Sequence, residues 1–155
     1  MGDIWRRFAE HSYAWVEVER SGIHCWQPPQ LRRLKLNTNV VIRLFGSYIA
    51  VSFKDSFSSL CMAYTERFGA IDPLVGEAVA LAEATLLAKW HRWNRVVFES
   101  DSFVLCDAVS SSAQPQLWAI SALISHIRCC LDEFADRRIT WVPCRCNAMA
   151  HLLAG

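Results

Sequence analysis

Two carboxylates near the middle of the chain stand where packing alone gives no reason for a charge. Glu77 lies within an apolar stripe of helical spacing, and Asp101 directly follows a β-branched run that predicts a strand over 95–99. The stripe consists of Leu74, Ala78, Leu81, Thr85 and Ala88. Carboxylates beside a hydrophobic core are costly unless a cation meets them. A helix-borne Glu and a strand-end Asp therefore form a candidate pair of divalent-metal ligands.

The surrounding pattern predicts the elements that must position these residues. Residues alternate between apolar and polar along 34–44, and short turns separate this stretch from the next two expected strands. Strands are expected over 34–44, 48–55, 60–67, 95–99 and 138–142. Helices are expected from Pro73 after an Asp72 cap, after Asp101–Ser102 as the next cap, over 117–134, and from an Asn147 cap to Gly155. The predicted fold is α/β: a mixed five-stranded sheet of three antiparallel strands followed by strands alternating with helices, with helices on its faces.

Several short motifs in one order resemble a known family. They are Lys35-Leu-Asn-Thr-Asn39, the helix carrying Glu77, Glu99-Ser-Asp-Ser102, and Asn147-Ala-Met-Ala-His-Leu-Leu-Ala154. Together they resemble the RNase H type-1 domain (RNase H-like), in particular the plant branch related to reverse transcriptases of non-LTR retrotransposons. The resemblance runs from about Trp26 to the last residue. It implies the RNase H-like fold and an endonuclease that cuts the RNA strand of an RNA–DNA hybrid with two bound Mg²⁺ (or Mn²⁺) ions.

The resemblance also assigns site residues. The family's catalytic positions fall on Asn39, Glu77, Asp101 and His151, of which Asn39, Glu77 and Asp101 would bind metal. The first position normally carries Asp, and an amide contributes no negative charge to a cation. Many relatives have Asp at the fourth position, and the plant branch often has His. We expect catalysis to be impaired or lost. Glu99, two residues before Asp101, should share its strand face and could compensate in part.

Each candidate residue also has an ordinary explanation. Glu77 could pair with an Arg near a helix start, Asp101 could be an N-cap, and His151 could be a core histidine. Asn39 could be a plain polar strand residue. The alternatives to a nuclease are a non-catalytic nucleic-acid-binding module and a remnant of a mobile element.

The cationic residues suggest where nucleic acid would bind. The net charge is only +1, but thirteen of the sixteen cationic side chains are arginine, which suits bidentate phosphate contacts. Lys89, Arg92 and Arg95 surround Trp90 and Trp93 and form the preferred nucleic-acid-binding segment outside the metal site. The alternative is that Trp93 fills the helix-to-strand turn while the cations are solvated.

The N-terminal part differs from the rest. Residues 3–20 predict a short helix and 21–33 a linker that contains Pro28-Pro29, so the expected division is 1–33 and an RNase H-like domain over 34–155. The first residues lack the apolar core of a signal peptide, and no apolar run reaches the roughly eighteen residues of a membrane span. We expect a monomer that resides inside the cell, in the cytoplasm or nucleus.

Seven cysteines, an odd number, suggest a reducing compartment rather than a disulfide framework. Cys144-Arg-Cys146 with His151 and the His24-Cys25 pair could together form a zinc site. The spacing differs from the usual two-residue knuckle, so buried thiols that act as small hydrophobes are the preferred interpretation.

Overall fold

The computed structural model describes residues 25–69, 72–112 and 118–154. The expected helix over 3–20, the beginning of the linker, His24 and Leu117 lie outside these residues. Within them the strands are β1 (Leu34–Arg43), β2 (Gly46–Lys54), β3 (Leu60–Phe68), β4 (Arg95–Ser100) and β5 (Asp136–Trp141). The helices are α2 (Pro73–Trp90), α3 (Phe103–Ser110), α4 (Ser121–Leu131) and α5 (Ala148–Ala154), with short 3-10 turns η1 (Trp118–Ile120) and η2 (Cys144–Asn147).

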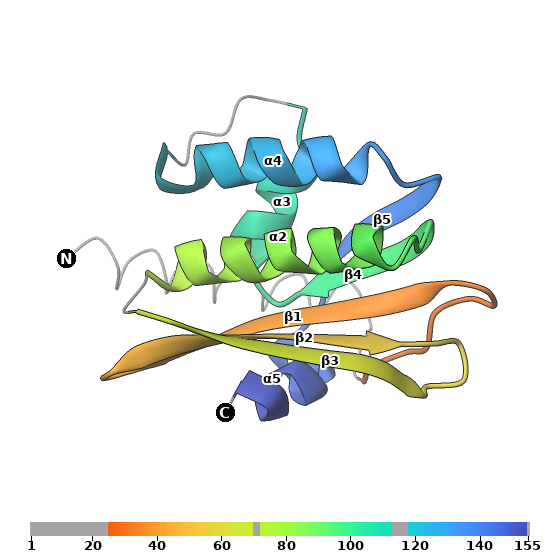
Figure 1. The fold of residues 1–155 in the computed structure, drawn as a ribbon, viewed down its shortest axis with the longest axis horizontal. Helices are drawn as coiled ribbons and strands as arrows, with labels where there is room; N and C mark the ends of the chain where they lie inside the picture. Colours follow the sequence, from red (N-terminus) through yellow and green to blue (C-terminus); the bar gives the residue numbers. More distant parts are fainter. Residues whose placement is uncertain (1–24, 70–71, 113–117, 155) are drawn as a thin grey trace.

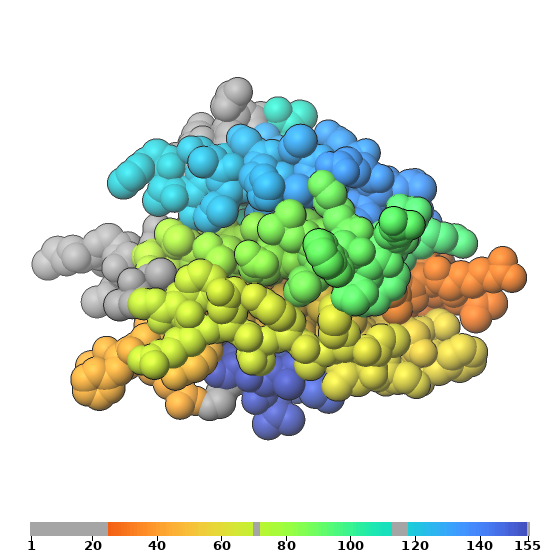
Figure 2. Space-filling model, in the orientation of Figure 1, coloured from red at the N-terminus to blue at the C-terminus, as the bar shows by residue number. Residues whose placement is uncertain are grey.

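The five strands form one mixed sheet in the order β3-β2-β1-β4-β5. β1, β2 and β3 are antiparallel neighbours, whereas β4 and β5 run parallel to β1. Helices α2, α3 and α4 lie on one side of the sheet, and α5 lies on the other (Figure 1). In the space-filling view α5 projects beneath the strands of the antiparallel half (Figure 2). The predicted fold class is confirmed.

The first hairpin differs from the expected one in its turn. β2 begins at Gly46, which pairs with Arg43, so the connection is the two residues Leu44 and Phe45 rather than 45–47. Gly46 has a φ of +151°, and a Cβ there would lie 3.0 Å from the carbonyl oxygen of Phe68. Glycine is therefore needed at the point where the neighbouring strand approaches. The period-two pattern located the strands, but not this tight turn.

Helix α2 is the centre of the α layer. Asp72 caps it as expected, accepting from the Leu74 N–H, and Pro73 occupies the first turn. All five residues of the predicted stripe are buried, and so are further small residues around the helix, Gly76, Ala80, Ala82 and Ala84. Small side chains let the helix pack on the sheet and on α4 at once. A helix that is apolar on nearly all sides is a buried helix.

The main core lies between the sheet and this helical layer. It contains strand residues such as Leu36, Phe53 and Phe98 together with helix residues such as Leu81 and Ile124. Alternate residues of β1 and β4 point the other way, toward the side of α5. No helix within the described ranges is both long and apolar enough to cross a lipid bilayer.

Candidate active site

The carboxyl ends of β1 and β4 meet at one edge of the parallel pair. Their last paired residues are Thr38 and Ser100. The next residues along the two strands are Asn39 and Asp101, so the first and third family positions are neighbours. In sheets with parallel strands, such carboxyl ends are where ligands usually bind.

Asn39 is almost completely buried, with 2% of its surface exposed. Its side-chain Nδ2 has no hydrogen-bond partner among the described residues. A buried amide without a partner is unusual, because leaving a polar group unsatisfied costs about 1–3 kcal/mol. Position 39 therefore holds a buried amide whose nitrogen has no hydrogen-bond partner among the described residues.

Glu77 contacts the neighbouring residue of β1 from helix α2. It stands in the second turn of α2, and its Oε1 accepts a hydrogen bond from the Val40 N–H at 3.2 Å. Val40 directly follows Asn39, so the carboxylate lies beside the peptide that links these two residues. The Asp72 cap fixes where α2 begins, and this start places the Glu77 side chain beside β1.

Asp101 is not the cap that the sequence predicted. Ser102 occupies the N-cap of α3, and its hydroxyl accepts from the Leu105 N–H at 3.4 Å. The Asp101 carbonyl oxygen accepts from the Trp141 indole N–H at 3.1 Å, which holds the residue against β5. The ordinary capping explanation for Asp101 is therefore wrong, and its carboxylate is available for other contacts.

This assignment predicts different stability effects for two neighbouring substitutions. Ser102→Ala should lower the free energy of unfolding by about 1 kcal/mol, because the first turn of α3 loses its cap. Asp101→Asn should change it by less, since an amide oxygen can still accept from His151. Urea unfolding of both variants checks this. A larger loss of unfolding free energy in Asp101→Asn than in Ser102→Ala would show that Asp101 has a mainly structural role.

His151 joins Asp101 to the last helix. Its Nε2 lies 3.0 Å from Asp101 Oδ2, and the hydrogen bond raises the pKa of the imidazole against the opposing effect of desolvation. Asn147 anchors the same segment, since its Nδ2 donates to the Thr38 carbonyl at 2.7 Å. The predicted capping role of Asn147 is wrong, because its Oδ1 has no partner among the described residues and the residue ends η2. Through this hydrogen bond Asn147 ties the start of α5 to Thr38 of β1, the residue before Asn39.

Cys144 lies beside His151 and Asp101, although the sequence favoured a buried thiol at this position over a zinc ligand. Its Sγ lies 2.8 Å from His151 Nε2, and Asp101, Cys144 and His151 form a cluster whose ligand atoms lie within 4.8 Å of one another. Although Cys144 is exposed overall, desolvation and the charge of Asp101 raise the pKa of its thiol to about 11. The seven-residue spacing from Cys144 to His151, two helical turns, was the available signal.

A second thiol, that of Cys106, is close enough to both Glu77 and Asp101 for their charges to affect its pKa. Cys106 in α3 is buried, and desolvation followed by the charges of Glu77 and Asp101 raises its pKa to about 12. Both carboxylates therefore act on the same region of the interior. The expectation of buried thiols holds for Cys106, Cys130 and Cys146, whereas Cys25, Cys61, Cys129 and Cys144 are exposed; all seven are free.

Glu99 is not available as a substitute carboxylate. It is buried, its Oε1 lies 2.6 Å from the Lys35 ammonium, and its Oε2 accepts from Asn37 Nδ2 at 2.8 Å. Lys35 in turn donates to the Gln27 carbonyl at 2.6 Å. Both oxygens of Glu99 thus have partners within the protein, and the predicted compensation for Asn39 is not supported by this arrangement.

The basic segment after α2 lies away from these residues. Trp93 packs on Phe53 with ring centroids 4.9 Å apart, as the structural alternative anticipated, and Trp90 is exposed. Lys89 pairs with Glu133 at 2.6 Å, and Arg95 lies 3.6 Å from Asp136. Arg92 forms no ion pair with any other described residue, so it is the cation of this segment most available to a phosphate.

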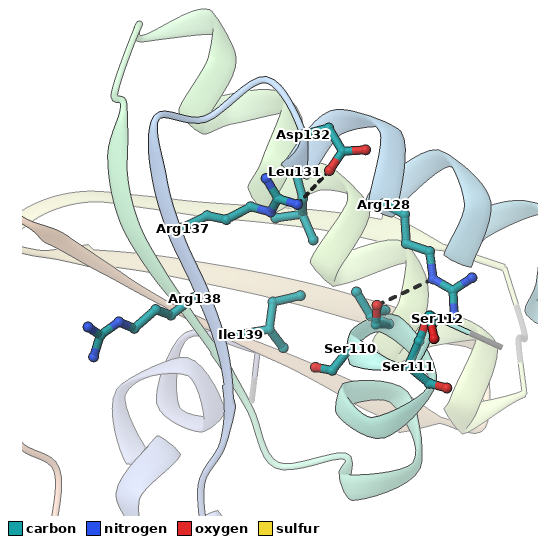
Figure 3. Close-up of a pocket in the computed structure, with 10 residues that line it drawn as sticks. Ser110, Ser111, Ser112, Arg128, Leu131, Asp132, Arg137, Arg138 and Ile139 are labelled. Carbon is teal, nitrogen blue, oxygen red and sulfur yellow. Dashed lines mark hydrogen bonds and ion pairs between the residues drawn. The ribbon is translucent and has the colours of Figure 1, made fainter.

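A pocket between the end of α3, α4 and β5 is separate from the candidate site (Figure 3). Two of its three arginines already have partners: Arg128 donates to the carbonyl oxygens of Ala108 and Ser111, and Arg137 pairs with Asp132. Arg138 extends away from the pocket serines in the close-up. Arg128 and Arg137 therefore hold neighbouring parts of the fold together rather than forming an open anion site.

Comparison with known proteins identifies the family. The model of the reverse transcriptase-like family matches residues 47–155. The chain belongs to this family. Its fold is RNase H-like: the RNase H1 of the archaeon Halobacterium salinarum NRC-1 superposes with a TM-score of 0.72 at 18% identity, covering 79% of this chain and 94% of that one.

Two further solved structures share the fold of this reverse transcriptase-like domain. LC11-RNase H1, solved in complex with an RNA/DNA hybrid, has a TM-score of 0.61 at 20% identity and covers 77% of this chain and 92% of its own. The foamy viral protease-reverse transcriptase in complex with RNA/DNA hybrid has a TM-score of 0.65 at 13% identity and covers 85% and 21% respectively. No curated protein sequence matches the chain. At these identities the structures establish the fold alone.

Proposed function

We propose that this reverse transcriptase-like domain is an RNase H-type module of the plant branch related to non-LTR retrotransposons, which binds RNA–DNA hybrids and cleaves their RNA strand poorly. The observation that carries the proposal is the meeting of Asn39 and Asp101 at the ends of β1 and β4, with Glu77 bound to the adjacent peptide. This arrangement supports the proposal, and the amide at position 39 means that one of the expected anionic ligands is missing.

The donor set fits one hard divalent cation and not two. Glu77 and Asp101 would hold Mg²⁺ or Mn²⁺ through carboxylate oxygens, with the Asn39 amide as a neutral neighbour. A bound cation would activate water and stabilise the charge that develops on phosphorus. A second cation would need a further anionic ligand, and Glu99 is already held by Lys35 and Asn37.

His151 should control the affinity of Asp101 for a cation, because it contacts the Asp101 carboxylate. While the imidazole is protonated, its positive charge and its hydrogen bond compete for the carboxylate. The raised pKa of His151 extends this state to higher pH than for a free histidine. Loss of that proton as the pH rises leaves Asp101 with its full charge, so cation binding should improve on the alkaline side.

The proposal is tested by replacing each carboxylate with its amide. Glu77→Gln and Asp101→Asn should each abolish residual Mg²⁺-dependent cleavage of a labelled RNA–DNA hybrid, because each removes one of two anionic ligands. Hybrid binding, measured by fluorescence anisotropy, should persist because phosphate contacts come from other residues. Residual cleavage that survives both substitutions would contradict the assignment, provided circular dichroism shows the variants folded.

A second candidate function, a binding module without cleavage, is favoured by the amide at position 39. It predicts that the unmodified chain binds hybrid and gives no Mg²⁺-dependent product above that of the Glu77→Gln variant. The same assays separate the two candidates, since the weak nuclease would exceed this control.

The basic segment provides a further prediction for hybrid binding. Replacing Arg92 and Arg95 together by Ala should weaken binding and flatten its dependence on salt by about one unit of slope for each lost phosphate contact. Arg95 already lies near Asp136, so Arg92→Ala alone should account for most of the change. Equilibrium binding at several salt concentrations checks this. An unchanged slope with intact affinity would assign both cations to the solvated surface.

A further inference from the structure

Three different metal-ligating groups converge on one point at the edge of the candidate active site. His151 Nε2 lies 2.8 Å from Cys144 Sγ and 3.0 Å from Asp101 Oδ2. One ring nitrogen thus faces both a thiol and a carboxylate. A single N–H can serve only one strong hydrogen bond at a time, whereas a cation at the centre of the three atoms would satisfy them all.

The chemistry of this set differs from that of a magnesium site. Mg²⁺ takes oxygen ligands, while a sulfur and an imidazole nitrogen select softer cations, of which Zn²⁺ commonly combines Cys, His and Asp. We propose that Asp101, Cys144 and His151 form a binding site for a thiophilic divalent cation, Zn²⁺ in particular. Cys146, which the sequence joined to this group, is buried and does not belong to the cluster.

The distances require little movement to accept the ion. Bonds of about 2.3 Å to sulfur and about 2.0 Å to nitrogen and oxygen place tetrahedral ligand atoms about 3.3–3.5 Å apart. The two contacts of His151 Nε2, 2.8 Å to Cys144 Sγ and 3.0 Å to Asp101 Oδ2, are slightly shorter than this, so each would open by less than about 1 Å. The thiol would lose its proton on coordination.

The fold supplies the three ligands from η2, from α5 and from the connection between β4 and α3. Cys144 begins η2 and His151 lies in α5, two helical turns later, while Asp101 is held between β4 and α3 by the Trp141 bond to its backbone. The Asp101 side chain is 14% exposed and that of His151 is 35% exposed, so solvent reaches the cluster. Three protein ligands leave a fourth position for water or a phosphate oxygen.

This site goes beyond the proposed nuclease function and does not depend on it. It shares Asp101 and His151 with the hard-cation site, but Cys144 belongs to the thiophilic site alone. Zn²⁺ binding is measured without nucleic acid, so a chain that never cleaves hybrid would still bind the ion. Where both functions hold, Zn²⁺ would compete with Mg²⁺ for Asp101.

The experiment titrates the reduced full chain with Co²⁺, whose thiolate complex has a charge-transfer absorption band, and then displaces Co²⁺ with Zn²⁺. The band should appear in the wild type and in Cys129→Ser, a control that removes an exposed thiol from α4. It should be lost in Cys144→Ser, with Zn²⁺ affinity reduced more than about tenfold, since even outer-sphere partners of metal ligands contribute about 10–100-fold. A band of unchanged intensity in Cys144→Ser, or none in the wild type, would overturn the proposal.

A second measurement needs no variant and so does not depend on the folding of Cys144→Ser. Mass spectrometry of the wild type after brief alkylation reports each exposed thiol separately. Zn²⁺ should slow the labelling of Cys144 several-fold and leave Cys61 and Cys129 unchanged, because they lie outside the cluster. Equal protection of all three thiols, or no protection of Cys144, would show that the ion does not bind at this site.

Discussion

Asn39→Asp should raise Mg²⁺-dependent cleavage of an RNA–DNA hybrid by at least about tenfold, which corresponds to about 1.4 kcal/mol of transition-state stabilisation. The substitution adds a negative charge beside Asp101, at a buried position whose amide nitrogen has no partner among the described residues. A carboxylate there can bind both cations of a two-metal site, whereas an amide cannot do so well. Single-turnover cleavage of a labelled hybrid measures the gain.

The matched control for this prediction is Asn37→Asp, two residues earlier on the same face of β1. Asn37 donates to Glu99, so an Asp there places two carboxylates together and supplies nothing to the site. It should not increase cleavage. A wild-type rate equal to that of Asn39→Asp would mean that the missing carboxylate does not limit the reaction.

The second large effect concerns stability. Lys35→Met should lower the free energy of unfolding by about 3–5 kcal/mol, because it leaves the Glu99 carboxylate buried without its cation. Both side chains are less than a tenth exposed, so water cannot replace the lost partner. Urea denaturation followed by circular dichroism measures the change.

The double variant Lys35→Met with Glu99→Met distinguishes an unpaired charge from lost packing. Replacing a buried ion pair by apolar residues of similar volume is often close to neutral. The double variant should therefore recover most of the stability that Lys35→Met loses. A double variant as unstable as the sum of the two single ones would show that the charges contribute independently, contrary to the observed pairing.

The elements of this fold could be predicted because local rules and tertiary packing agree. Alternation along β1 and the Asp72–Pro73 signal located the first strand and the main helix to within a residue. Errors arose where two polar residues competed for one role. Asp101 and Ser102 are both good caps, and the choice of Ser102 depends on a contact between Asp101 and Trp141, forty residues away in the chain.

The candidate site was only partly visible in the sequence. The positions of Glu77, Asp101 and His151 followed from a family pattern, and the parallel register of β1 and β4 brings Asn39 beside Asp101. The pairing of Glu99 with Lys35 could not be inferred, since it is a buried contact between residues 64 positions apart in the chain. Cys144 was weighed as a zinc ligand with Cys146 and His151 but interpreted as a buried thiol, whereas it is exposed and clusters with His151 and Asp101.

The central claim is that position 39 limits the binding of hard divalent cations, and Mn²⁺ binding followed by electron paramagnetic resonance tests it most directly. Free Mn²⁺ is titrated against the wild type, Asn39→Asp, and Asn39→Asp combined with Asp101→Asn. The account predicts weak binding by the wild type, binding at least about tenfold tighter for Asn39→Asp, and a return to weak binding in the double variant. Equal Mn²⁺ affinity of the wild type and Asn39→Asp would contradict the account.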